Sequence, residues 1–140
     1  MRDTLNALAV RTDWVLPGLA EGRLLTGRNS PEAIADYYLE RGAQAVIIKL
    51  GPEGSYYRGS LGGEHADFTL PGVPVAEAVD TAGAGDGFAV GVISALLDGL
   101  SPHEALKRGN LIGALAVQVR GDVEGLPDRI RLGELTSPLK

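Results

Sequence analysis

The residues best suited to chemistry lie in one glycine-rich stretch, residues 80–88, which reads Asp-Thr-Ala-Gly-Ala-Gly-Asp-Gly-Phe. Gly83, Ala84 and Gly85 precede the carboxylate of Asp86, and an apolar segment follows. The pattern predicts a tight loop that opens a buried helix, whose first N–H groups and partial positive charge can hold a phosphate. Because a carboxylate there repels an anion, we expect Asp86 to handle a proton or a metal ion. The alternative is structural, an Asp that only stabilises a helix start.

Two other phosphate-binding loops are excluded by the same residues. The sequence contains no G-x-x-x-x-G-K-[ST] motif, so a P-loop is absent from it. Phe88 stands where the dinucleotide-binding fingerprint requires a third small residue. The stretch therefore belongs to a different kind of anion site.

Composition narrows the class of protein. The 140 residues are enough for one compact domain, which we expect to span residues 1–140. The net charge of −5 argues against a nucleic-acid partner. No cysteine is present, which excludes disulfides and thiolate metal sites and fits a cytoplasmic protein. We predict no secretory signal and no membrane partner, because the longest apolar run falls short of the roughly 20 residues that span a bilayer.

The elements that must position these residues follow from periodicity, caps and turns. We expect helices over residues 3–10, 21–25, 31–41, 84–98 and 102–120, and strands over residues 14–16, 45–50, 55–58 and 65–70. Ser30 and Ser101, each followed by a proline, are the predicted caps of two of these helices. This order of elements predicts an α/β fold with a mainly parallel sheet.

Two smaller patterns predict how helices pack. Leu5, Leu8 and Ala9 share one face of the first helix, which we expect to be its apolar side. Gly87 and Gly91 form a Gly-x-x-x-Gly spacing, which we assign to packing against a sheet rather than to dimerisation in a membrane.

The longer string resembles a known signature. Residues 80–86, followed by Val90-Gly91, are similar to the C-terminal motif of the pfkB, or ribokinase-like, carbohydrate kinases. The resemblance covers nearly all 140 residues but only the C-terminal half of that family. It implies a three-layer ribokinase-like (Rossmann-like) sandwich, with the nucleotide-binding half present and the N-terminal sugar-binding and lid half absent. The helix over residues 3–10 suits a chain that starts within a domain.

The resemblance implies a reaction. The γ-phosphate of ATP passes to a primary hydroxyl of a sugar or sugar acid, and Asp86 accepts or aligns the hydroxyl proton. Gly83, Ala84, Gly85 and Asp86 supply the backbone anion hole.

The resemblance also assigns metal ions. Residues 13–27 are similar to the family segment that carries an Asn-x-x-Glu motif, whose Glu organises a water-bound Mg²⁺. Glu21 occupies the Glu position, whereas Gly18 occupies the Asn position. In part of the family a monovalent cation such as K⁺ lies near the positions of Asp80 and Thr81. A Glu that merely stabilises a helix start is the alternative for Glu21.

The expected nucleotide contacts come from three segments. Residues 49–54 resemble the family's strand and turn that line the nucleotide pocket, where Lys49 either meets a phosphate or reaches solvent. The helix over 102–120 is expected to border the adenine, and a connection before residue 80 to add apolar contacts. The full set is Lys49, Gly51, Gly54, Val75, Val79, Gly85, Asn110, Gly113 and Ala114. A simple turn and plain helix packing are the alternatives.

Residues 87–101, 108–122 and 124–127 are most similar to 2-keto-3-deoxygluconate kinases, which implies that sugar acid as the substrate. A fructokinase- or ribokinase-type kinase half is one alternative. A truncated, inactive fragment that binds nucleotide or self-associates is another. In every case we expect a homo-oligomer, formed through an open sheet edge, or a separate N-terminal half as partner.

Overall fold

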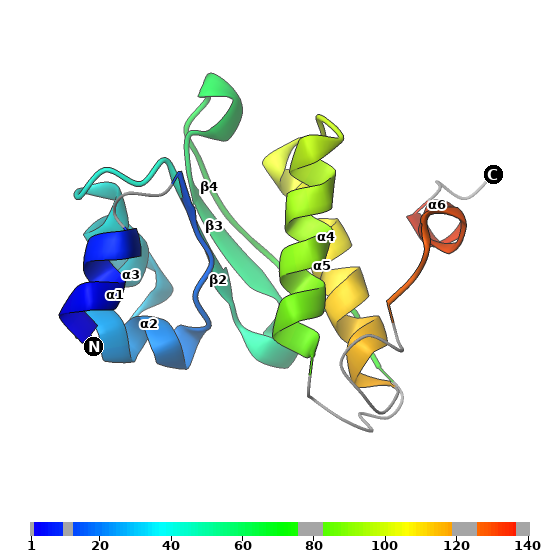
Figure 1. Ribbon diagram of the computed structural model, residues 1–140, viewed down its shortest axis with the longest axis horizontal. Helices are drawn as coiled ribbons and strands as arrows, with labels where there is room; N and C mark the ends of the chain where they lie inside the picture. The colour runs from blue at the N-terminus through cyan, green and yellow to red at the C-terminus, as the bar shows by residue number, and fades with distance from the viewer. Residues whose placement is uncertain (1, 10–12, 76–82, 119–125, 137–140) are drawn as a thin grey trace. The chain divides into compact units, whose positions relative to one another are not determined.

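The described strands of the chain form one sheet in the computed structural model (Figure 1). One of its two inner strands is β2 (Ala45–Lys49), whose apolar residues are buried. The structure describes residues 2–9, 13–75, 83–118 and 126–136, and the chain divides into two units, Met1–Pro71 and Gly72–Lys140. In the first unit β1 (Trp14–Val15), β2, β3 (Ser55–Gly59) and β4 (Ala66–Leu70) form one sheet in that order.

The α/β class is confirmed, but the prediction of a mainly parallel sheet is wrong for the described residues. Only β1 and β2 pair in parallel, whereas the β2–β3 and β3–β4 pairs are antiparallel. The cause is the length of the connections. Two helices, α2 (Leu19–Thr26) and α3 (Pro31–Leu39), separate β1 from β2 and allow a crossover. The later strands are joined by single turns, η1 (Gly51–Glu53) and η2 (Leu61–Gly63), which permit only hairpins.

Helix α3 supplies the core of the first unit. It begins as predicted, because Ser30 Oγ accepts a hydrogen bond of 3.1 Å from the Ala33 N–H and Pro31 follows at the first helical position. Its buried face packs against one face of the sheet. The buried residues of this cluster are Ile34, Ala35, Tyr38, Ala43, Val46, Ile48 and Tyr56.

The first helix, α1 (Arg2–Ala9), uses only part of the face predicted for it: Ala9 packs against the core, whereas the two leucines do not. Leu5 and Leu8 are exposed, and the buried residue is Asn6. The Asn6 side-chain amide donates to the Leu25 carbonyl oxygen at 2.6 Å, and its oxygen accepts a bond of 3.0 Å from the Tyr38 hydroxyl. Hydrogen bonds of Asn6 therefore help to hold α1 against its neighbours where contacts of Leu5 and Leu8 were expected.

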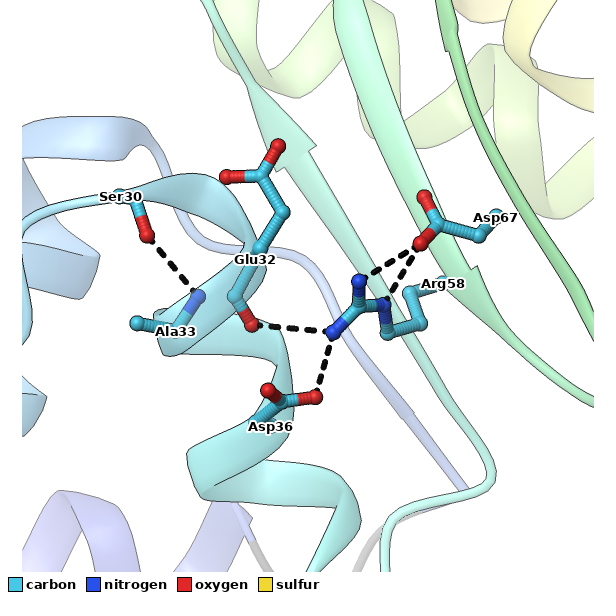
Figure 2. A network of polar contacts seen from close by, with 6 residues as sticks. All are labelled: Ser30, Glu32, Ala33, Asp36, Arg58 and Asp67. Atoms are coloured by element: carbon cyan, nitrogen blue, oxygen red, sulfur yellow. Dashed lines mark hydrogen bonds and ion pairs between the residues drawn. The ribbon is translucent and has the colours of Figure 1, made fainter.

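A single arginine ties α3 to the hairpin (Figure 2). Arg58 contacts Asp36 on α3 at 2.5 Å and the Asp67 carboxylate on β4 at 2.6 Å. The Arg58 guanidinium is the main cause that holds the pKa of Asp67 below its ordinary value. Figure 2 also shows Arg58 donating to the Glu32 carbonyl oxygen.

The contribution of this ion pair to stability should depend on pH. We expect Asp67→Asn to lower the free energy of unfolding by about 0.2–1 kcal/mol at neutral pH, the range of a solvent-screened pair, since Asp67 is 40% exposed. The folded-state pKa lies below the ordinary 3.8, so the contribution is complete above 3.8 and is lost as the pH falls through the lowered pKa. Urea unfolding of both proteins across this range should give converging stabilities. A difference that stays constant down to the most acidic pH would contradict the assignment.

The second unit is built from helices. They are α4 (Ala84–Leu97), α5 (Pro102–Val117) and α6 (Arg129–Thr136). Helix α5 begins at the predicted cap, where Ser101 Oγ accepts from the Glu104 N–H at 3.2 Å. Figure 1 shows α4 and α5 lying side by side. Asp98 at the end of α4 pairs with Arg129 at 2.7 Å and with Arg108 at 2.9 Å, and both arginines hold its pKa well below the usual range.

Among the helices of the described residues, none combines the length and the apolar character needed to cross a bilayer.

Candidate functional site

The glycine-rich stretch forms the predicted helix start. Gly83 adopts φ +77°, in the left-handed region that favours glycine, and caps α4 without a side chain. The first hydrogen bond of the helix runs from the Gly87 N–H to the Gly83 carbonyl oxygen at 2.8 Å. The N–H groups of Ala84, Gly85 and Asp86 therefore precede that first bond and point out of the helix start. This is a geometry that can hold an anion.

Asp86 lies in the first turn of α4 with its side chain exposed, while Gly87 and Phe88 behind it are buried. The Asp86 carboxylate is therefore exposed to solvent and accessible to a reactant. Val79, Asp80 and Thr81 fall outside the described residues, so their proposed nucleotide and K⁺ contacts stay predictions.

Helix α5 meets the start of α4. A Cβ added at Gly113 would lie 3.3 Å from the Ala84 carbonyl oxygen and 3.7 Å from Phe88 Cβ. Asn110 is buried one turn earlier on α5, and Ala114 is half-buried beside Gly113. The structure therefore brings Gly113, an expected border of the adenine, next to the expected anion hole.

Glycines also allow α4 and α5 to approach each other closely. The prediction that Gly87 and Gly91 pack against a sheet was wrong. A Cβ at Gly91 would lie 2.7 Å from Gly109 Cα and 2.8 Å from the Arg108 carbonyl oxygen, so the glycine of α4 faces α5 and not a sheet. The missed signal is a second Gly-x-x-x-Gly spacing at Gly109 and Gly113. Two such spacings on consecutive helices indicate that the helices pack on each other.

In the first unit, the expected metal residue and the expected phosphate-binding lysine lie on adjoining elements. Gly18 caps α2 and forms a parallel bridge with Lys49 at the end of β2. The Lys49 N–H donates to the Pro17 carbonyl oxygen at 3.0 Å. Glu21 is exposed in the first turn of α2, with Oε1 3.5 Å from where a Cβ at Gly18 would lie. The Glu21 carboxylate thus lies beside the residue at the position of the family Asn, at an ordinary van der Waals distance.

The turn after β2 closes on itself. The Leu50 N–H donates to the Gly54 carbonyl oxygen at 2.9 Å, and the Gly54 N–H donates to that of Gly51 at 3.1 Å. Gly51 and Gly54 both have positive φ, +62° and +111°, which favours glycine at each position. Apart from its chain neighbours, no atom of the described residues lies within 4 Å of a Cβ built on Gly51, so a ligand can approach the backbone there.

The described candidate residues suit one way of holding Mg²⁺, in which Glu21 supplies the carboxylate. Within the described part of the chain, no group of three or more His, Cys, Asp or Glu side chains could hold a metal ion. Glu21 offers a single exposed carboxylate. Mg²⁺ keeps several of its waters and is commonly bound by one or two carboxylates together with substrate phosphates. The Glu21 carboxylate therefore suits an ion held through water and nucleotide.

The candidate residues thus form two groups, one in each unit. Glu21, Lys49, Gly51 and Gly54 belong to the first unit. The α4 start, Asn110, Gly113 and Ala114 belong to the second, as does the half-buried Val75.

Comparison with known proteins places the chain in a family. The profile described as pfkB family carbohydrate kinase matches residues 1–129, which is most of the chain. The chain belongs to the pfkB family of carbohydrate kinases.

Individual relatives agree with this assignment. The chain is 56% identical over 137 residues to a 2-dehydro-3-deoxygluconokinase of Bacillus subtilis (strain 168), covering 98% of this chain and 41% of the relative. It is 52% identical to the solved PfkB protein from Polaromonas sp. JS666, with a TM-score of 0.80, covering 94% and 39% of the two chains. A structure from E. coli, assigned as a ribokinase II and in complex with ATP and Mg²⁺, is 34% identical, with a TM-score of 0.84 and coverage of 95% and 42%. The chain thus spans about two fifths of the length of these relatives and shares the ribokinase-like α/β fold over that part.

Proposed function

We propose that this chain carries the nucleotide-binding and base-supplying part of an ATP-dependent sugar-acid kinase. The observation that carries the proposal is the start of α4, where three N–H groups precede the first helical bond and the Asp86 carboxylate is exposed in the same turn. The identity to a 2-dehydro-3-deoxygluconokinase favours 2-keto-3-deoxygluconate, the same compound, as the acceptor.

The proposed step is an in-line phosphoryl transfer. The acceptor hydroxyl gives its proton to Asp86 while its oxygen forms a bond to the γ-phosphorus, and the bond from that phosphorus to the oxygen of the leaving ADP breaks. The N–H groups of Ala84, Gly85 and Asp86 stabilise charge on the transferring group. A donor of this kind is worth on the order of 2.7–4 kcal/mol. Mg²⁺, when bound, neutralises charge on the phosphates.

The nucleotide contacts follow from the same two groups of residues. We assign Lys49 to a phosphate, because it ends a buried strand beside the helix start that carries Glu21. The exposed backbone of Gly51 and the turn at Gly54 give close access to the ligand. Val75, Asn110, Gly113 and Ala114 are the proposed walls of the nucleoside.

Glu21 should determine the Mg²⁺ concentration that ATP binding requires. We expect Glu21→Gln to raise the Mg²⁺ concentration needed for half-maximal ATP binding by about 10- to 100-fold, the usual cost of losing an outer-shell carboxylate. Titrating Mg²⁺ into wild type and variant at fixed ATP measures this. Glu32→Gln, which changes an exposed first-turn Glu of α3, is the matched control. An unchanged requirement in Glu21→Gln would leave that residue with only a helix-stabilising role.

We propose that the part of the pfkB fold that lies outside this chain acts as its partner. The chain spans about two fifths of its relatives, so the other residues of the fold, or a second copy of this chain, would complete the sugar site. An inactive fragment that binds nucleotide or self-associates is the alternative, as is a fructokinase- or ribokinase-type half.

A coupled ADP-release assay tests the proposed function. The chain is incubated with ATP, Mg²⁺ and 2-keto-3-deoxygluconate, fructose or ribose, with a sugar-free sample to measure hydrolysis. We expect release above that background with the sugar acid. Release with fructose or ribose instead would move the chain to the other kinase types, and background release with every sugar would favour the inactive fragment.

A further inference from the structure

Helices α4 and α5 of the second unit contact each other through glycines, in the middle of α4 and near its start. Towards the middle of α4, Gly91 faces Gly109, with atoms of the α5 backbone 2.7–2.8 Å from a Cβ built on Gly91. Near the start of α4, a Cβ on Gly87 would lie 3.3 Å from the Ile112 carbonyl oxygen, and one on Gly113 would lie 3.3 Å from that of Ala84. The backbone of α5 is therefore in direct contact with the first turn of α4.

The contact at Ala84 matters because of which peptide group it touches. The carbonyl of Ala84 and the N–H of Gly85 belong to the same planar peptide unit. Any displacement of the Ala84 oxygen therefore turns the Gly85 N–H, one of the three N–H groups proposed to hold the transferring phosphate. A methyl group at 3.3 Å from the oxygen is tighter than an ordinary van der Waals contact, so the peptide unit must move by a few tenths of an ångström to accommodate it.

We propose that Gly113 is a positioning residue, whose lack of a side chain lets α5 set the orientation of the Gly85 N–H at the start of α4; this inference rests on the proposed function. It differs from the role implied by the family resemblance, in which Gly113 leaves room for the adenine. The two roles separate with a ligand that has phosphates but no base. Positioning acts on any bound polyphosphate, whereas an adenine wall acts only on ATP.

The test compares Gly113→Ala with Gly133→Ala, a helical glycine of α6 whose added Cβ would meet no atom within 4 Å. Amide NMR spectra of the free chain report the position of the Gly85 N–H without any ligand. Calorimetric titrations with ATP and with inorganic tripolyphosphate, both with Mg²⁺, report binding. We expect the Gly85 amide signal to move in Gly113→Ala and not in the control. We also expect both ligands to bind more weakly by the same factor, roughly 3- to 10-fold, as for one weakened charge-assisted hydrogen bond.

Three outcomes would overturn the inference. The first is weaker binding of ATP alone, with tripolyphosphate binding and the Gly85 signal unchanged, which assigns Gly113 to the base. The second is a Gly85 signal that does not move. The third is a Gly113→Ala chain that fails to fold, because a contact of 3.3 Å predicts only a local displacement. Failure of the proposed function is distinct: the wild-type chain would then bind neither ligand, while the Gly85 signal would still test the contact.

Discussion

Asp86→Asn is expected to lower the rate of ADP release with 2-keto-3-deoxygluconate by about 10²- to 10⁴-fold, the usual contribution of a positioned general base. An amide cannot accept the hydroxyl proton, but it keeps the size of the side chain. Binding of ATP with Mg²⁺ should be retained or tightened, because the change removes a negative charge from the turn that holds the phosphates. Steady-state kinetics and a calorimetric titration of the same variant measure the two effects separately.

Glu104→Gln is the matched control for this prediction. Glu104 is also an exposed acid in the first turn of a helix of the same unit, α5, but it is not part of the proposed site. Its substitution should leave the rate unchanged. Equal rates in Asp86→Asn and the wild type would remove the proton role of Asp86 and leave it as a helix-stabilising residue.

Gly91→Ala should lower the stability of the chain more than Gly113→Ala or Gly133→Ala does. The added methyl would lie 2.7–2.8 Å from backbone atoms of Arg108 and Gly109, and backbone cannot move aside as a flexible side chain does. The helices must separate along their shared surface. We expect the free energy of unfolding to fall by about 1–3 kcal/mol, as for other overpacked cores. Urea unfolding followed by far-ultraviolet circular dichroism measures it.

Gly133→Ala is the control in the same assay, and it should not lower the free energy of unfolding. Its methyl meets open space, and alanine favours a helix over glycine by up to about 1 kcal/mol, so this variant should be unchanged or more stable. If Gly91→Ala were as stable as Gly133→Ala, the close approach of α4 and α5 would be refuted.

Local signals in the sequence predicted the elements well where cap residues or long apolar runs were present. The strand around Ala45–Lys49, the hairpin that follows it and the helix starts at Pro31 and Pro102 all agree with the structure. The directions of the strands could not be predicted from the composition of β2 alone. Apolar, β-branched residues in β2 indicate burial on both faces, which occurs in parallel and in mixed sheets. Connection length decided the strand directions.

Packing partners were harder to predict than elements. Periodicity assigned Leu5 and Leu8 to the buried side of α1, but Asn6 is buried because the Leu25 carbonyl and the Tyr38 hydroxyl satisfy it. Those two groups come from other helices, and nothing within α1 reveals them. The same limit explains Gly91, whose partner lies on the following helix.

In the candidate site, too, local features could be predicted from the sequence, whereas contacts between elements could not. The helix start at Gly83 follows directly from its glycines, since the left-handed φ and the missing side chain are local properties. The close approach of Gly113 to Ala84, and the bridge between Gly18 and Lys49, depend on elements brought together by folding. Chemical roles came from the family resemblance, and the contacts within each unit now give specific residues with which to test them.

Calorimetric titration of the chain with ATP in the presence of Mg²⁺ shows whether the chain binds nucleotide as proposed. We expect saturable binding that is weakened when Mg²⁺ is withdrawn. We also expect Asp86→Asn to retain this binding. Absence of any binding heat at millimolar ATP with Mg²⁺, from a chain shown to be folded by circular dichroism, would contradict the proposed binding of nucleotide.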